Sequence, residues 1–381
     1  MSTATTTPRP SYLDELEPIL TEIIAPAAGE IDRTAAYPQA ALDALAQTGL
    51  MGLVSAQEVG GLGEGIRAAT RVVKQIARHC ASTTLVVCMH YAAAAVIEAH
   101  GPRAVREAIA EGHAVATLAF SEAGSRSHFW ATVSTATASG ESVRLDARKG
   151  WITAAGKADL YVWSSHPLAA EGMSTIWLVP ATAEGLRVTA PFDGLGLRGN
   201  YSSPVTAEGV IVSQGAMLGE DGKGFDIMVQ IVLPYFQFMR AGCCLGMMEA
   251  ATTKAAAHAG GTALEHLGQS LADLPTVRAY IARMRIKTDM VRALLLDGLD
   301  ALESGRADAM LRVLEVKAAA GETSTEVTDL AMRVSGGAAF RKEVGVERHF
   351  RDARAATVMA PTTDSLYDFI GKVTCGMPLF G

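Results

Sequence analysis

The sequence predicts an α+β fold in which an N-terminal helical domain, a middle β-sheet domain and a C-terminal helical domain follow one another. Apolar residues recur every three or four positions from Tyr12 to about Gly112, which is the spacing of an amphipathic helix. Short runs rich in Val, Thr and Ile, separated by Gly, Asp and Ser, extend from about Ala114 to Val212 and indicate strands. Helical spacing returns at Gly224. The predicted domains are residues 1–114, 115–223 and 224–381.

The predicted helices end at proline and glycine. In the first domain Pro26 and Pro38 interrupt the helical pattern, because proline lacks the amide that a helix interior needs. In the third domain two long helices are expected over 273–303 and 309–335, and the second is followed by Gly336-Gly337. Such a pair commonly caps a helix, but it also lets backbone amides approach a pyrophosphate, and both interpretations stay open.

Composition limits the kinds of partner. The 381 residues suffice for two to three domains with cores of their own, and 49% of them are apolar. The formal net charge is −7, so we expect no broad basic surface and no nucleic-acid partner. The five cysteines form no CxxC pair and no cluster with histidine, which predicts core residues in a reducing compartment and no metal site.

The sequence also predicts a cytoplasmic protein. The first ten residues lack the basic and then apolar order of a signal peptide. The most apolar stretch, Thr84 to Ile97, is short for a membrane span and contains His90. We therefore expect no membrane span.

Two loops carry side chains suited to chemistry, although the chain has no GxGxxG after a strand, no Walker loop, no HExxH and no GxSxG. The first, Ser121 to Phe129, combines hydroxyls, a glycine, an arginine and a histidine, although taken alone this composition favours a solvated turn. The second, Lys149 to Asp159, is interpreted as a glycine turn followed by Trp151 and Thr153 on a strand edge. An indole and a hydroxyl placed there suit a flat heteroaromatic ligand, whereas a core tryptophan is the alternative.

Together with other segments in the same order along nearly the whole chain, these loops resemble the acyl-CoA dehydrogenase family. Residues Phe120 to His128 are similar to the family's T-E-P-G-x-G-S-D loop, and KGWITAAGKAD is similar to its K-x-W-I-T-N-A strand. LGLRG, LGEDGKGF, VSGGAAF and VERHFRDAR resemble its later motifs, and IAPAAGEIDR, LAQTGLMGL, EVGGLGEG and IARHCAST resemble its opening helices. The resemblance implies a C-terminal four-helix bundle and a homotetramer, or a homodimer, with FAD at a subunit interface.

The resemblance also implies a reaction. In the family a carboxylate removes the α-proton of an acyl thioester while the β-hydrogen leaves as hydride to the flavin, and an electron-transferring flavoprotein takes the electrons. The implied substrate is an acyl group on coenzyme A or on an acyl carrier protein. A base near the α-carbon and a flavin beside the β-carbon are what this chemistry requires.

Cofactor-binding residues follow from the same likeness. Phe120, Ser121 and Ser127, with Arg126 beside them, are expected at the flavin or its chain, and Trp151 and Thr153 on its other side. The pyrophosphate and adenine are expected near Gly336, Gly337, Thr362 and Asp364, partly from a neighbouring subunit. Leu264 replaces a family arginine that reaches the pyrophosphate, whereas Arg333 replaces a glutamine, so we expect Arg333 to compensate. A solvent-facing Arg333 is the alternative.

Both usual positions of the catalytic base lack a carboxylate. The family's glutamate aligns with Ala360, and the second position used by some relatives aligns with Phe236. Replacement candidates are Asp364, His128, Tyr235 and Tyr367, and for each of them a structural role is the favoured alternative. Loss of a general base removes about two to four orders of magnitude in rate, so an altered mechanism is expected.

Three functions remain open from the sequence. The leading hypothesis is an FAD-dependent acyl-CoA dehydrogenase-like oxidoreductase with a non-standard or absent base. The second is a flavin-dependent monooxygenase of the same fold. Arg126 and His128 stand where the family has glycine and aspartate, and the serine-rich run from Ser121 to His128 resembles such monooxygenases. The missing bases also suit a non-catalytic subunit of a mixed tetramer. The identity of the acyl chain does not follow from the sequence.

Overall fold

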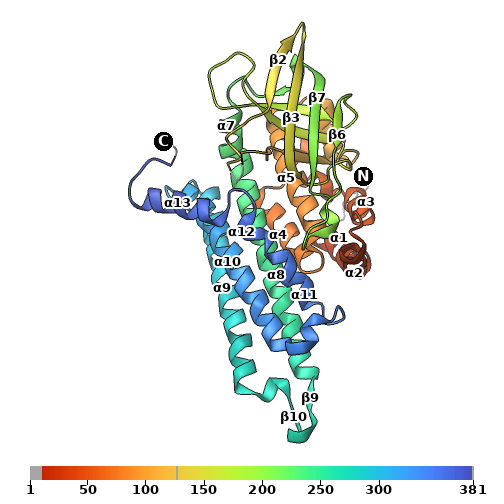
Figure 1. The fold of residues 1–381 in the computed structure, drawn as a ribbon, viewed down its shortest axis with the longest axis vertical. Coiled ribbons are helices and arrows are strands. Elements are labelled where there is room, and N and C mark those ends of the chain that lie inside the picture. The colour runs from red at the N-terminus through yellow and green to blue at the C-terminus, as the bar shows by residue number, and fades with distance from the viewer. Residues whose placement is uncertain (1–10, 126–127, 380–381) are drawn as a thin grey trace, which may run out of the picture.

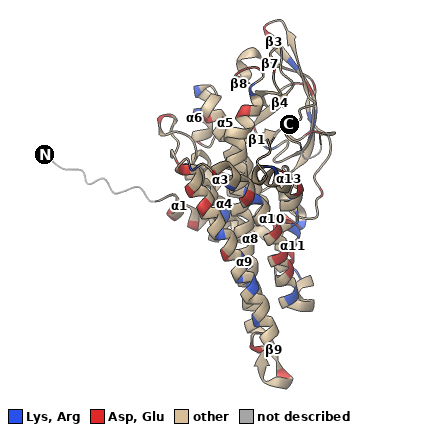
Figure 2. Cartoon of the chain, turned by 90° about the vertical axis from the view of Figure 1, so that its left-hand side faces the viewer, with Lys and Arg blue, Asp and Glu red and all other residues tan. Residues whose placement is uncertain are grey.

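The computed structural model describes residues 11–125 and 128–379. Most strands gather at one end of an elongated molecule, and three long helices extend from them to the other end, where a short strand pair lies (Figure 1). Lys and Arg alternate with Asp and Glu along these helices (Figure 2). The order helical, sheet, helical confirms the predicted fold class.

The N-terminal helices surround an apolar central one. They are α1 (Tyr12–Ile19), α2 (Ala25–Thr34), α3 (Gln39–Gln47), α4 (Ile66–Ala77), α5 (Ala81–His100) and α6 (Arg103–Ala110). Ser11 begins α1 with a capping box, because its side chain accepts from the Asp14 amide while Asp14 accepts from the Ser11 amide. Helix α5 is apolar on nearly all sides, and it is buried accordingly.

The middle domain contains two four-stranded sheets. One has the order β1-β4-β5-β8, with β1 (Ala116–Ala119), β4 (Leu160–Ser165), β5 (Thr175–Pro180) and β8 (Met217–Leu218). The other is antiparallel with the order β2-β3-β7-β6, formed by β2 (Thr135–Ser139), β3 (Ser142–Ile152), β7 (Ser203–Ser213) and β6 (Leu186–Val188). Val143, Trp163 and Trp177 share one apolar cluster, so the sheets pack face to face.

The C-terminal domain is built on three long helices, α8 (Leu233–Gly261), α9 (Pro275–Glu303) and α10 (Ala309–Ser335). The remaining elements are α7 (Gly224–Ile227), β9 (Ala263–Leu264), β10 (Gln269–Ser270), α11 (Val346–Ala353), α12 (Ala355–Val358) and α13 (Thr363–Thr374). Helix α8 approaches α4 so closely that a Cβ at Gly246 would lie 2.3 Å from the carbonyl oxygen of Lys74. One continuous apolar core therefore joins both helical domains.

Two helices meet the length and composition of a membrane span. They are Ala81–His100 and the continuous helical stretch Gly224–Gly261, and 89% and 83% of their most apolar windows are buried inside the protein. The stretch Thr84 to Ile97, which is short for a span, lies inside the longer helix Ala81–His100, because the helix continues through polar residues at both ends. Burial inside the protein is the property of core helices of soluble folds, so the two helices are weak evidence for a membrane.

Candidate functional site

The loop after β1 lies directly against strand β3. The Gly150 amide donates to the Ser121 carbonyl at 3.0 Å, and the Ala123 amide donates to the Arg148 carbonyl at 3.0 Å. Gly150 therefore lies inside β3, and the turn predicted there is wrong, because the strand continues to Ile152. The two loops that the sequence analysis selected are adjacent in space.

A buried ion pair joins the two loops. Lys149 Nζ lies 2.5 Å from Glu122 Oε1, and both side chains are buried. Three further donors reach the Glu122 carboxylate, from the Val133 amide at 2.6 Å, the Ser134 amide at 2.8 Å and the Ser134 hydroxyl at 2.6 Å. Burial lowers the pKa of Lys149 to about 8, although Glu122 opposes this. A buried charge pair with complete hydrogen bonding holds the backbone of both loops in place.

Trp151 is presented to solvent rather than to the core. Its side chain is 74% exposed, and its φ of +60° lies in the left-handed region that a bulky residue seldom adopts. The core-tryptophan alternative is therefore wrong. An exposed indole held in a strained backbone beside the Ser121 loop is a surface suited to a flat ligand.

The other predicted residues near this surface differ in exposure. Thr153 is buried, its hydroxyl lies 3.1 Å from that of Ser202, and its carbonyl accepts from Thr117 at 2.8 Å. Phe120 is buried in the helical core, while Ser121 is half-buried. His128 is exposed, with its ring edge against Trp130 at 5.0 Å. Arg126 and Ser127 lie outside the described residues.

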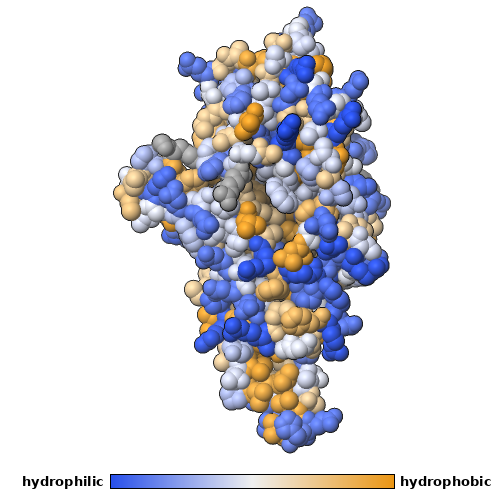
Figure 3. All heavy atoms as spheres, viewed as in Figure 1, coloured by the Kyte–Doolittle hydropathy of each residue, from blue (hydrophilic) through white to orange (hydrophobic). Residues whose placement is uncertain are grey.

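A small apolar cavity of about 30 Å³ lies between the loop after β1 and the C-terminal helices. It is lined by Phe129, Val229, Leu233, Met310, Leu314, Pro361, Phe369 and Leu379. Trp130 contacts Phe369 at 5.5 Å between ring centroids, so the loop after β1 also touches α13. Figure 3 shows a hollow between the sheet end and the helices, with apolar residues beside it. No carboxylate is among the described residues that line this cavity.

The two positions where the family carries its base are occupied by Ala360 and Phe236, and neither side chain is a carboxylate. Ala360 is half-buried, and Lys317 Nζ donates to the carbonyls on either side of it, to Met359 at 2.9 Å and Pro361 at 2.6 Å. Phe236 on α8 packs against the apolar core. The loop that carries Ala360 is therefore held in place by a buried lysine.

The replacement bases are poorly suited in this arrangement. Asp364 is exposed in the first turn of α13, where Thr362 caps the helix by accepting from the Ser365 amide at 3.3 Å. Burial raises the pKa of Tyr235, and burial and Glu322 raise the pKa of Tyr367 to about 12. A phenol with a raised pKa stays protonated at neutral pH, so neither tyrosine is prepared to accept a proton.

The glycine pair lies far from the apolar cavity. Met310 lines the cavity at the start of α10, whereas Gly336 ends that helix with a φ of +55°, about 40 Å away at about 1.5 Å per residue. Arg333 lies in the last turn of α10, largely exposed, and pairs with Asp329 at 3.2 Å. Leu264 is in β9, which Figure 1 shows at the tip of the helices. One chain therefore does not bring Gly336 and Gly337 to the cavity, whereas Thr362 and Asp364 follow Pro361, which lines it.

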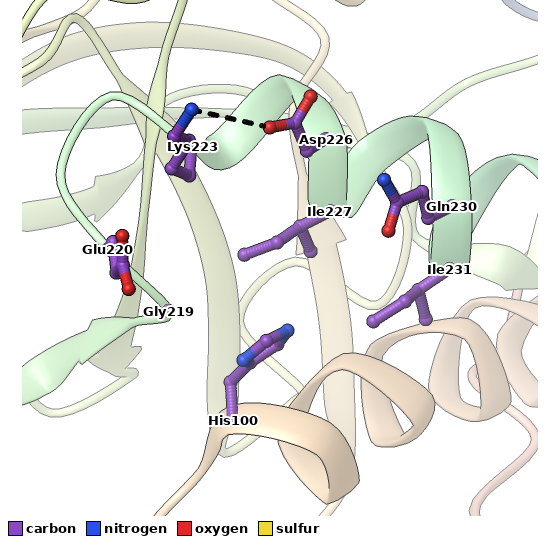
Figure 4. Close-up of a pocket in the computed structure, with 8 residues that line it drawn as sticks. All are labelled: His100, Gly219, Glu220, Lys223, Asp226, Ile227, Gln230 and Ile231. Atoms are coloured by element: carbon purple, nitrogen blue, oxygen red, sulfur yellow. Dashed lines mark ion pairs between the residues drawn. The ribbon is translucent and has the colours of Figure 1, made fainter.

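A second pocket of about 270 Å³ lies between the end of α5 and α7 (Figure 4). It is more polar, and Lys223 pairs with Asp226 at 4.0 Å beside it. Its lining residues are His100, Gly219, Glu220, Lys223, Asp226, Ile227, Gln230 and Ile231. None of the residues predicted from the sequence contributes to it.

Comparison with known proteins agrees with this architecture. Models of the acyl-CoA dehydrogenase N-terminal, middle and C-terminal domains match residues 11–115, 117–210 and 222–374. The chain belongs to the acyl-CoA dehydrogenase family. Members of this family are FAD-binding flavoproteins and oxidoreductases, so the resemblance and the cofactor expected from the sequence are confirmed.

Particular relatives show how broad the match is. The short-chain specific acyl-CoA dehydrogenase of Bos taurus mitochondria is 28% identical over 347 residues, covering 89% of this chain and 83% of the relative. A glutaryl-coenzyme A dehydrogenase in complex with glutaryl-CoA has a similar fold, with a TM-score of 0.90 at 22% identity over 96% and 94% of the two chains. The prolyl acyl carrier protein oxidase AnaB has a TM-score of 0.86 at 18% identity over 95% and 97%.

Four buried charged residues were not selected from the sequence. Glu122 and Lys149 lie within the two quoted motifs, but their pairing joins residues 27 positions apart in the chain. Lys317 and Arg240 lie on the buried sides of apolar helices, both 1% exposed. A charged residue inside an apolar helical stretch is the signal that identifies them.

Proposed function

We propose that this acyl-CoA dehydrogenase-family flavoprotein acts on the α,β carbons of an acyl thioester and does so without the usual carboxylate base. The exposed Trp151 indole, strained and adjacent to the Ser121 loop, is the observation that supports it most directly. A flat aromatic side chain next to a fixed loop fits an isoalloxazine ring, which has a large planar face. When bound, FAD supplies the acceptor for a hydride.

The chain's own residues orient the ligand and exclude water. Glu122 and Lys149 hold the loop that faces Trp151, and the apolar cavity leads from Phe129 to Pro361. An apolar lining removes water from the acyl group, which strengthens electrostatic interactions there. Lys317 holds the backbone at Ala360, which is where the family's glutamate would stand.

The proposed subunit arrangement follows from the distance along α10 between the cavity and the glycine pair. Because Arg333, Gly336 and Gly337 are about 35–40 Å from the cavity at about 1.5 Å per residue, we propose that they serve the FAD of a second subunit in a homotetramer or homodimer. Thr362 and Asp364 would contribute from the cavity end. We keep Phe120, Ser121, Arg126, Ser127 and Thr153 as proposed cofactor contacts, and the domain boundaries at 114/115 and 223/224.

Substrate and location are proposed at the level of chemistry. The acyl group is carried on coenzyme A or on an acyl carrier protein, an electron-transferring flavoprotein takes the electrons, and the protein is cytoplasmic. The relative that oxidises a prolyl acyl carrier protein supports the carrier-bound choice.

A non-catalytic subunit of a mixed tetramer is the second candidate. Two observations favour it. None of the described residues that line the cavity is a carboxylate, and Ala360 and Phe236 occupy the two positions of the usual base. This candidate predicts bound FAD, no turnover alone, and turnover when a base-bearing homologue is co-expressed.

An absorption spectrum followed by anaerobic titration tests the proposal. The purified protein should show a flavin spectrum, and acyl-CoA or acyl-pantetheine thioesters should bleach it. A flavin that binds the thioester but stays oxidised would contradict dehydrogenation and favour the non-catalytic subunit. Absence of flavin in the purified protein and after incubation with FAD would reject both candidates.

A further inference from the structure

A buried arginine in α8 has the Cys243 thiol beside it but no carboxylate partner among the described residues. Arg240 is 1% exposed, and its three guanidinium nitrogens form no hydrogen bond within the described part of the chain. One turn earlier on the same face, Gln237 is fully buried, and both polar atoms of its amide are also unpartnered. Arginine remains protonated in proteins, and a buried charge is costly unless an anion neutralises it.

The neighbouring ionisable groups do not neutralise this charge. Burial raises the pKa values of the thiols of Cys88 and Cys243 to about 12, so both are uncharged at neutral pH. Lys317 on α10 is a further cationic group, and its pKa is lowered to about 7 by burial and by the Arg240 charge. Among the ion pairs of the described residues, none includes Arg240 or Lys317. Lys317 donates to two backbone carbonyls, but no carboxylate among the described residues pairs with Arg240.

This arrangement lies next to the apolar cavity. Leu233 lines the cavity and precedes Gln237 by one turn of α8, and Leu314 lines it and precedes Lys317 by one turn of α10. The two helices run side by side (Figure 1). Gln237 and Lys317 each lie one turn beyond a residue that lines the cavity, and Arg240 lies two turns beyond Leu233, so the anionic end of a ligand whose apolar stem enters the cavity would face these side chains.

We propose that Arg240 and Gln237 bind a carboxylate, and that this carboxylate belongs to the acyl group of the thioester. The guanidinium offers paired N–H donors that match the two oxygens of a carboxylate, and the Gln237 amide adds a donor. The substrate is then the half-thioester of a dicarboxylic acid. The source of the carboxylate rests on the proposed function, whereas the anion site does not.

Calorimetric titration of the FAD-loaded protein tests the site. The ligands are the pantetheine half-thioesters of succinate and glutarate and, as neutral matches, their methyl esters. At least one half-thioester should bind about tenfold or more tightly than its ester, because hydrogen bonds to charged groups contribute more than neutral ones. Arg240→Gln should abolish this difference, and the exposed control Arg285→Gln should keep it. Equal affinities of acid and ester in the wild-type protein would overturn the proposal without any variant.

A second arm separates the two sources of a carboxylate. Sodium acetate is compared with sodium chloride at equal ionic strength in thermal unfolding. If acetate raises the unfolding temperature saturably in the wild type but not in Arg240→Gln, while half-thioesters and esters bind equally, the site takes free carboxylates and the substrate assignment is overturned. If the protein binds no FAD, the proposed function fails, and the acetate comparison still reports on Arg240.

Discussion

Replacing Lys149 with methionine tests how the two cofactor-facing loops are held together. Methionine keeps most of the apolar stem but leaves the Glu122 carboxylate buried without its cation, with the Ser134 and Val133 donors as its remaining partners. Removing one member of a buried ion pair costs about 3–5 kcal/mol. The variant also loses the hydrogen bonds from Lys149 to the carbonyl and hydroxyl of Ser164, at 2.7 Å and 3.0 Å.

The free energy of unfolding is measured by denaturant titration, with flavin absorbance after gel filtration as a second readout. We expect Lys149→Met to lower stability by about 3–5 kcal/mol and to reduce FAD retention, because the loop beside Trp151 loses its attachment. The double variant Glu122→Gln/Lys149→Met removes both charges and should recover part of the loss, since the pair is coupled. A loss below about 1 kcal/mol in the single variant would refute the reasoning, because that is the contribution of an exposed pair.

Three further predictions concern the base, the cofactor and pH. Ala360→Glu should raise turnover of a bound thioester by about 10²–10⁴-fold while the control Ala360→Gln does not, because only the glutamate restores a general base; equal rates in both would reject the assigned position. Arg333→Ala should raise the dissociation constant for FAD about tenfold, whereas loss of its exposed pair with Asp329 should change stability by less than about 1 kcal/mol; unchanged FAD affinity in the assembled oligomer counts against the proposed contact. Burial raises the pKa of Asp352 to about 6, above its unfolded value of 3.8. The folded protein therefore holds this proton more tightly than the unfolded chain, so the free energy of unfolding should fall as pH rises from about 4 through 6. Asp352→Asn keeps the acceptor for the Leu197 amide and should flatten this part of the stability profile, measured by denaturation between pH 4 and 8.

The sequence predicted which segments form the candidate site, but it did not predict which of their residues contact one another. The runs around Ser121 and Trp151 were selected for their residue types, and the structure places them against each other through the Gly150 amide. Side-chain exposure was not available from the pattern, so Trp151 was equally consistent with the core. Its left-handed backbone, which turns the indole outwards, depends on how β3 pairs with β7.

The order of domains follows from local periodicity, which needs no knowledge of neighbours. Helices with apolar residues every three or four positions and strands with short apolar runs bury those residues whatever the final arrangement. The absence of a carboxylate at Ala360 and Phe236 is equally a property of the residues present.

Ion pairs between residues distant in the sequence depend on the tertiary structure, because a charged side chain needs a partner only where it is buried away from water. Glu122 and Lys149 form an ion pair because the loop after β1 packs on β3. Arg240 and Lys317 lie on helices α8 and α10, which pack side by side, and no carboxylate of the described residues pairs with either. The separation of Gly336 from the cavity likewise follows from the length of one straight helix. Residue types set which groups are charged, and packing sets which of them water no longer reaches.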